Sequence, residues 1–406
     1  MTNPTDQNRN GRYKVAIIHP LDPRGLKVGG IETFVRDYIA LHPPEMDLLL
    51  IGVDGFGDLE LGKVHKVTVR GREIDFLPVI HIPDDVSSVP EGGLLRAVLL
   101  RFKLAILRRY FQIRKMLKAG GYTIDLRRIE LSTLPVAFGV KSVQMLHDGM
   151  SQDKAMSSLL KKYWWVKTAA EGFSVKHAGA FYCVNADLTE RLKTSYPKHA
   201  AKLDTLPTWA NPEIFATAPY VLDGTMNVIF TGRLDLFKRP DLMFQTIAEV
   251  RKLTDKIRFH YVGDGDPETF PEFAAIRDIT IRHGRKTSEQ IAELLRTMHI
   301  GILTSDFEGM PRVVMECLSV GRPVVALHLP QLEVVIEGGV SGYLVPRGPD
   351  QTVEHARRLV DTFEAIESGA ITPEKVASKV EPFSAVRLLG KLWRNHRILQ
   401  GLEERA

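Results

Sequence analysis

Short apolar segments alternate with helical segments twice along this chain, and this repeated alternation limits the fold more than any other feature. The apolar segments are bounded by turn residues, as is typical of buried strands. In the first half we expect strands at 13–19, 47–53, 74–80, 142–146 and 179–184. In the second half we expect them at 227–231, 257–262, 279–281, 300–303, 323–326 and 343–345. Two successive βαβ series predict two parallel, doubly wound α/β domains.

The helical segments and one polar stretch set the expected domain limits. Helices fit at 31–41, 94–118, 186–194, 240–253, 288–298, 313–320 and 355–366. The polar, proline-containing stretch 216–226 is typical of a linker. We therefore expect an N-terminal domain over 1–215 and a C-terminal domain over 227–381.

Composition excludes several classes of protein. Apolar residues make up 44% of the 406 residues and charged residues 25%, which excludes a disordered chain or a collagen-like repeat. No run of about 18 uncharged apolar residues occurs, so we expect no membrane span. The N-terminus lacks the apolar segment of a secretory signal. With only Cys183 and Cys317, a disulfide framework is excluded, and we expect a cytoplasmic protein.

The most informative window is DFEGMPRVVMECLSVGRPVVA at 306–326. A strand is expected to end near Thr304 and a helix to begin at about Pro311, so backbone N–H groups there would form an anion site suited to a diphosphate. Glu308 and Glu316, with seven residues between them, could accept hydrogen bonds from separate hydroxyl groups of one extended ligand. Alternatively, Glu308 only favours the helix dipole and Glu316 is a solvated surface residue.

Three further clusters contain residues that could bind a ligand or a metal ion. In FTGRLDLFKRP, Arg233 and Lys238 follow a strand, where two cations would stabilise a departing diphosphate, unless this is an ordinary basic loop. Gly29 and Gly30 come before a predicted helix and permit close approach of a ligand, or simply form a turn. Asp-Gly-Asp at 264–266 could bind a metal, but turn chemistry is the preferred interpretation.

Together these motifs resemble the retaining glycosyltransferases of family 4. The resemblance lies in GGIE at 29–32, GRLDLFK at 232–238, VGDG at 262–265 and Glu308-x7-Glu316 followed by GRPVV. It implies the GT-B architecture, in which two Rossmann-like domains face each other across a cleft. It also implies a nucleotide-sugar donor held mainly by the C-terminal domain, no cofactor and no required metal. The last helix, within 382–406, would pack back toward the N-terminal domain.

The resemblance also assigns roles in donor binding. Arg233 and Lys238 match the pair that binds the donor diphosphate and stabilises the leaving group. Glu308 matches the carboxylate near the hydroxyls of the transferred sugar, and Glu316 the one that binds the ribose. Backbone contacts to sugar and phosphate are implied for Gly309, Met310 and Pro311.

Two residues of the first half are also carried over. Gly30 matches the glycine that approaches the diphosphate. His147 matches the active-site histidine at the end of a strand, where it would orient sugar and acceptor. In one departure, this chain has Leu-Pro-Gln at 329–331, where the family usually has a Gly-Gly pair.

A basic amphipathic segment lies within the first half. The first 220 residues carry 30 Lys and Arg against 23 Asp and Glu, a net charge of +7, and 92–124 contain no acidic residue. On the helix expected at 94–118, an apolar stripe opposite the core face lies among the arginines and comprises Leu100, Leu104, Leu107 and Phe111. This pattern favours contact with an anionic membrane surface, although a helix buried by a second layer would show it too. Nucleic-acid binding is disfavoured, because the segment matches no binding module.

The combined prediction is a cytoplasmic enzyme, peripheral on the inner face of the plasma membrane. It would move a hexose from a nucleotide-diphosphate sugar to a hydroxyl of a lipid-linked saccharide, in bacterial exopolysaccharide or lipopolysaccharide synthesis. Two alternatives stay open: a nucleotide-sugar 2-epimerase of the same fold, or a non-catalytic sugar-nucleotide-binding component of a membrane assembly.

Overall fold

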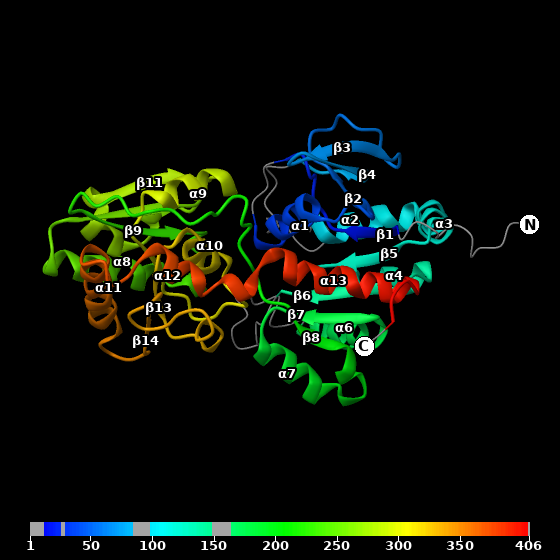
Figure 1. Cartoon of the computed structure of the whole chain (residues 1–406). Helices are drawn as coiled ribbons and strands as arrows, with labels where there is room; N and C mark the ends of the chain where they lie inside the picture. The colour runs from blue at the N-terminus through cyan, green and yellow to red at the C-terminus, as the bar shows by residue number, and fades with distance from the viewer. Residues whose placement is uncertain (1–11, 26–28, 84–97, 148–163, 405–406) are drawn as a thin grey trace, which may run out of the picture. The chain divides into compact units, whose positions relative to one another are not determined.

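The structure is a computed structural model that describes residues 12–25, 29–83, 98–147 and 164–404. It divides into two compact units. The described part of unit 1 comprises 12–25, 29–83, 98–147, 164–206 and 386–404, and that of unit 2 comprises 207–385. Each unit has its own sheet of mainly parallel strands with helices around it (Figure 1). The predicted α/β class with two parallel sheets is therefore confirmed.

Unit 1 has an eight-stranded sheet in the order β3-β4-β2-β1-β5-β6-β7-β8, parallel except for β3 against β4. The strands are β1 (Tyr13–Ile18), β2 (Met46–Asp54), β3 (His65–Val69), β4 (Arg72–His81), β5 (Thr123–Leu126), β6 (Ser142–Leu146), β7 (Ala180–Cys183) and β8 (Leu203–Thr205). The helices are α1 (Gly30–Leu41), α2 (Val98–Arg108), α3 (Tyr110–Gly120), α4 (Thr133–Phe138), α6 (Trp164–His177), α7 (Ala186–Ser195) and α13 (Ala385–Gln400).

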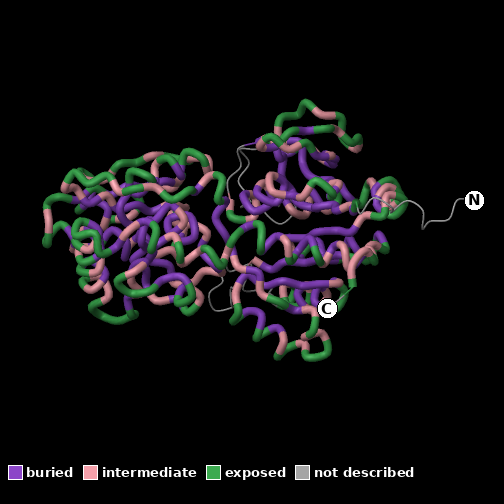
Figure 2. Tube along the Cα trace, viewed as in Figure 1, coloured by how far each residue is buried: buried purple, intermediate pink, exposed green. Residues whose placement is uncertain are grey.

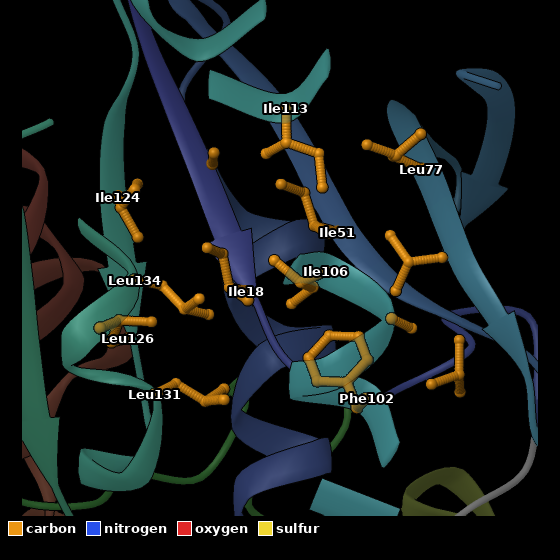
Figure 3. Packing of buried hydrophobic residues seen from close by; sticks show 14 of the residues in the cluster. Ile18, Ile51, Leu77, Phe102, Ile106, Ile113, Ile124, Leu126, Leu131 and Leu134 are labelled. Atoms are coloured by element: carbon orange, nitrogen blue, oxygen red, sulfur yellow. The ribbon is translucent and has the colours of Figure 1, made fainter. Parts of the chain in front are cut away.

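The two faces of this sheet are covered by different helices. Alternate residues of a strand point to opposite faces, so Ile124 and Leu126 of β5 pack with Phe102 of α2 in one apolar cluster (Figure 3). Asp125 between them instead lies 3.2 Å from His396 Nε2 of α13. The C-terminal helix thus packs on unit 1 through a buried polar contact as well as apolar ones.

The helix expected at 94–118 is two helices. Its first four residues, 94–97, lie outside the described residues. The helical backbone is interrupted at Arg109 (φ −105°, ψ 21°), between α2 and α3. There the Arg109 guanidinium donates to the Val79 carbonyl at 3.0 Å, and the Gln112 amide donates to the Gly62 carbonyl. These contacts with β4 and with the loop before β3 are made where the helix is interrupted. No proline or glycine lies at this point, so the sequence alone does not predict the interruption.

Unit 2 has a six-stranded parallel sheet in the order β11-β10-β9-β12-β13-β14. The strands are β9 (Met226–Thr231), β10 (Ile257–Val262), β11 (Thr280–Gly284), β12 (Ile300–Leu303), β13 (Val324–Leu327) and β14 (Gly342–Val345). The main helices are α8 (Pro240–Leu253), α9 (Ser288–Arg296), α10 (Arg312–Val320), α11 (Gln351–Glu367) and α12 (Pro373–Ser378). The central strands are buried and the outer surfaces of the helices are exposed (Figure 2).

The segment predicted as a linker is held to unit 2 by a buried arginine. The side chain of Arg322 is 0% exposed. Its guanidinium donates to the carbonyls of Ala218, Pro219, Leu295, Arg296 and Val320 at 2.7–3.2 Å. The guanidinium also lies 4.7 Å from the ring centroid of Tyr220. Residues 218–220 are therefore fixed to unit 2.

Acid is expected to destabilise unit 2 through His260. Burial and the adjacent His283 lower the pKa of His260 to about 4, whereas a histidine in the unfolded chain titrates near ~6.5. Between these values the unfolded state binds a proton that the folded state does not, so the free energy of unfolding falls as the pH drops. The expected loss by pH 4 is up to about 3 kcal/mol.

Urea unfolding of unit 2 at pH 7 and pH 4.5, followed by amide exchange in β9 and β10, measures this loss. The His260→Gln variant should show a shallower pH dependence than the wild type, whereas a His65→Gln change in unit 1 should leave it unchanged. Equal slopes in wild type and His260→Gln would refute the assignment.

Candidate functional site

Two loops of unit 2 meet where strands β9 and β12 end. These strands are neighbours and parallel, so their carboxyl ends share one edge of the sheet. Thr304 Oγ1 donates to the Lys238 carbonyl at 2.8 Å. The Asp306 N–H donates to the Phe237 carbonyl at 2.7 Å. The loop after β9 is therefore bound to the loop after β12.

This joining brings together a cation and a carboxylate that the sequence analysis singled out. Lys238 Nζ lies 2.8 Å from Glu308 Oε1, and the two side chains are only 15% and 14% exposed. Ser305 Oγ donates to the same carboxylate oxygen at 2.9 Å, and the Gln331 amide donates to the Glu308 carbonyl at 2.8 Å. A Cβ added to Gly232 would lie 3.8 Å from Lys238 Nζ, so the ammonium lies close to the backbone of the loop after β9.

Glu316 is a buried residue of α10, at 6% exposure. Arg312 Nε lies 2.9 Å from Glu316 Oε1, one turn earlier on the same helix. The alternative interpretation of Glu316 as a solvated surface residue is therefore wrong. Pro311 is the N-cap of α10 rather than its first residue. Gly309, with Met310, belongs to the loop leading to it, and the Met310 side chain is buried.

Arg233 is placed differently from Lys238. Its side chain is 62% exposed and lies 2.9 Å from Asp235 Oδ2. It lines a hollow of about 300 Å³ whose described lining includes neither Lys238 nor Glu308. The structure thus brings Lys238 to Glu308, while Arg233 pairs with its own loop.

The two aspartates of the Asp-Gly-Asp turn have protein partners. Asp264 pairs with Arg285. Asp266 Oδ1 accepts the Glu268 N–H at 3.1 Å and caps the short helix that follows. Within the described ranges, no three His, Cys, Asp or Glu side chains are grouped to hold a metal ion.

In unit 1, Gly30 is the first residue of α1 and Gly29 its N-cap. The Glu32 carboxylate lies against the backbone at this helix start. A Cβ added to Gly29 would lie only 2.2 Å from Glu32 Oε2, so a larger residue at position 29 would displace the carboxylate. Glu32 Oε1 lies 3.6 Å from His19 Nε2. Burial opposes ionisation of Glu32, but the interactions with His19, a backbone N–H and Arg128 together outweigh it and lower the pKa of this carboxyl.

His147 follows β6 and meets α1. Its ring packs edge-on against Phe34, with 5.3 Å between centroids. Burial, with the positive charges of Arg127 and Arg128, holds the pKa of His147 well below its ordinary value, so the imidazole is neutral near pH 7. Its buried Nε2 has no hydrogen-bond partner among the residues that the structure describes. A neutral histidine with one uncommitted ring nitrogen can bind a ligand hydroxyl.

Sequence reasoning missed several residues that support this site. Arg312 could have been found, since an Arg four positions before a Glu on a helix is a pairing signal. Gln331 was noted only as a departure from the family pattern. Arg347 Nη1 lies 2.9 Å from Asp306 Oδ1, and no sequence signal indicates this contact.

Comparison with known proteins shows similarity to sugar transferases. Residues 225–362 match the sequence model described as Glycosyl transferases group 1. The alpha-D-kanosaminyltransferase of Streptomyces kanamyceticus is 27% identical over 353 residues, covering 81% of this chain and 87% of that protein. The putative colanic acid biosynthesis glycosyltransferase WcaL of Salmonella typhimurium is 27% identical over 182 residues. That match covers 41% of this chain and 44% of the relative.

Solved structures agree on the fold. Sucrose-phosphate synthase from Thermosynechococcus elongatus matches with a TM-score of 0.72 at 15% identity, covering 94% of this chain and 98% of that one. Anabaena HepE in complex with UDP-glucose matches at 0.64 and 14% identity, with the same coverage. The fold is therefore that of a GT-B glycosyltransferase. Residues 225–362 match the group 1 glycosyltransferases, and a sugar transferase is similar over most of the chain, so the comparisons agree with the resemblance to family 4 found in the sequence.

Proposed function

We propose that this glycosyltransferase moves a hexose from a nucleotide-diphosphate sugar to a hydroxyl of a lipid-linked saccharide, with retention at the anomeric carbon. The observation that carries the proposal is the Lys238–Glu308 pair, 2.8 Å apart, in the loops that precede α8 and α10. The UDP-glucose bound to HepE supports UDP as the first donor to test. The name of the Salmonella relative, which refers to colanic acid biosynthesis, supports a role in bacterial exopolysaccharide synthesis.

The chemistry follows from where negative charge develops. The bond between the anomeric carbon and the donor phosphate oxygen breaks, and the acceptor oxygen forms its new bond on the same face. The acceptor proton passes to the leaving phosphate oxygen. Lys238, Arg233 and the N–H groups at the start of α10 would stabilise the departing diphosphate. Glu308 would hold Lys238 in place and bind hydroxyls of the transferred sugar, and Glu316 would bind the ribose.

Positive charge from side chains and amides would serve without a metal ion, so chelation with EDTA should leave the transfer rate unchanged. Neutral His147 would orient the sugar and acceptor through Nε2. Gly30, at the start of α1, would allow backbone to approach the diphosphate.

Thermal-shift measurements with UDP, GDP and ADP test the donor part of the proposal, because a ligand that binds the folded state raises its melting temperature. The matching nucleotide sugars, supplied with lipid-linked acceptors, should then yield a glycoside. Donor consumption without a glycoside would favour the 2-epimerase alternative. Failure of all three nucleotides to stabilise the chain would contradict the proposal.

The surface of α2 and α3 supports peripheral contact with the inner face of the plasma membrane. Leu104, Leu107 and Phe111 are 46%, 42% and 83% exposed, beside exposed Arg108 and Lys115. Apolar side chains set among cations fit the interface of an anionic bilayer. Among the helices of the described residues, none is long and apolar enough to cross a bilayer.

Substituting Leu104→Gln, Leu107→Gln and Phe111→Ser together is expected to weaken binding to phosphatidylglycerol vesicles by roughly 100-fold, because three apolar side chains no longer insert. Vesicle co-sedimentation at two salt concentrations measures this, and wild-type binding should weaken with salt. The control is Leu253→Gln, which alters an exposed leucine at the end of α8 in unit 2. This variant should bind like the wild type. An unchanged affinity of the triple variant would rule out this surface.

A further inference from the structure

A second polar cluster lies along the carboxyl edge of the unit 1 sheet and includes neither Gly30 nor His147. We refer to it as the Arg24 cluster. It comprises Asp22, Arg24, Asp54, Phe56, Asp58 and His81. The residues follow β1, end or follow β2, and end β4. These three strands are parallel and adjacent, so their carboxyl ends meet at one edge.

Two buried carboxylates make the loop after β2 rigid. Asp22 and Asp54 are 0% and 1% exposed. Asp22 Oδ2 accepts the Gly55 N–H at 2.8 Å, and Asp54 Oδ1 accepts the N–H groups of Phe56 and Gly57 at 3.2 and 3.0 Å. Buried carboxyl groups need polar partners, and Arg24 lies 2.8 Å from Asp22 and 3.2 Å from Asp54.

This rigid loop presents an aromatic ring to solvent. Phe56 is 58% exposed, although its backbone is fixed by Asp54. The Arg24 guanidinium carbon lies 5.1 Å from the centroid of the ring, within cation–π range. The ring is thus supported by Arg24 and held in place without being covered.

Polar groups suited to hydroxyls belong to the same cluster as the ring. His81 Nδ1 lies 2.9 Å from the Asp54 carbonyl, so Nδ1 carries the proton and Nε2 is left as an acceptor. The His81 side chain is 45% exposed and packs against Gly57, where a Cβ would lie 3.1 Å from the ring. Asp58 is 57% exposed and receives two hydrogen bonds from Arg24.

We propose that the Arg24 cluster binds a pyranose ring of the acceptor saccharide, with Phe56 as the stacking surface. A pyranose has one apolar C–H face and equatorial hydroxyls at its rim, which match an exposed phenyl ring in one cluster with His81 and the Asp58 carboxylate, the latter joined to the ring through Arg24. A bilayer is the weaker fit, because inserting Phe56 would desolvate Asp58 and Arg24 beside it. The inference rests on the proposed function, since it assigns the acceptor of that reaction.

Saturation-transfer NMR of the full chain with methyl glucoside, mannoside and galactoside, in the absence of donor, tests the inference. At least one glycoside should receive saturation from the wild type. In Phe56→Ala its affinity should fall roughly tenfold, the loss expected for one aromatic stacking contact. Phe56→Trp should retain binding. Leu61→Ala, an exposed apolar change further along the same loop, is the matched control and should bind normally.

The outcomes separate this inference from the proposed function. Absence of saturation transfer to all three glycosides, or equal affinity in Phe56→Ala and wild type, would overturn the inference. A loss of vesicle binding in Phe56→Ala with glycoside binding intact would also overturn it and assign the ring to a bilayer. The proposed function depends instead on stabilisation by a nucleoside diphosphate, which is measured on the same protein.

Discussion

Lys238→Ala is expected to lower the turnover number for sugar transfer by about 100- to 1,000-fold, because a charge aimed at a developing anion contributes in this range. The ammonium is largely shielded from water, at 15% exposure, and is fixed by Glu308, so its effect on a departing diphosphate is not diluted by solvent. Stability should fall by only about 1–3 kcal/mol, because the Glu308 carboxylate loses a charged partner but keeps its hydrogen bond from Ser305. Turnover with the best nucleotide-sugar donor, beside the urea unfolding midpoint, separates the two effects.

Lys252→Ala is the matched control for this experiment. Lys252 is on α8, is 67% exposed and pairs with Glu249 on the same helix, so its loss should leave turnover unchanged. Lys238→Arg should recover part of the activity, since the positive charge is retained. Wild-type turnover in a folded Lys238→Ala protein would show that the diphosphate is not stabilised by this residue.

Arg322→Met is expected to destabilise unit 2 by about 3–5 kcal/mol, which is the largest stability effect we predict. The substitution keeps most of the side-chain volume but removes the guanidinium from five backbone carbonyls. Those of Val320 and Leu295 keep an N–H donor from Ala218 and Met298, and the loss of the other hydrogen bonds in a buried place is costly. Burial lowers the pKa of Arg322 to about 10, so the guanidinium stays charged at neutral pH. For a unit of this size the melting temperature should fall on the order of 10 °C.

Calorimetry of the full chain measures this change, with amide exchange in β12 and β13 assigning the transition to unit 2. Arg251→Met is the control, because its guanidinium is 36% exposed and binds at the surface; it should cost less than about 1 kcal/mol. A melting temperature of Arg322→Met within experimental error of the wild type would show that the hydrogen bonds from Arg322 to the five carbonyls contribute little to stability. We refer to these five carbonyls as the carbonyl cage.

Local patterns predicted much of the fold. Buried strands such as β1 and β9 contain short apolar runs, VAII and VIF, between turn or polar residues. Such a run can be recognised without knowledge of the neighbouring strand. Strand β5 was missed, although it lies between β1 and β6 in the sheet. Its sequence, TIDL, places Asp125 in the middle of a buried strand, and an acidic residue there argues against a strand until its partner His396 is known.

In the candidate site too, the sequence predicted some features correctly and others only became clear from the structure. Glu308 and Lys238 were selected by motif, and the structure places them in contact. Arg233 was selected by the same reasoning but pairs with Asp235 in its own loop. Which of two nearby cations meets a carboxylate 70 positions away depends on the path of the loop, and no spacing rule in the sequence describes that path.

The order of amino acids was enough to specify two parallel sheets, the helices around them and the residue types gathered at their loops. Those features depend on periodicity and turn chemistry over a few neighbouring residues. The break at Arg109, the carbonyl cage of Arg322 and the exposed ring of Phe56 emerged only from the folded chain. Each depends on a hydrogen bond, ion pair or ring contact between segments remote in sequence, and such contacts form only when packing brings them within a few ångströms.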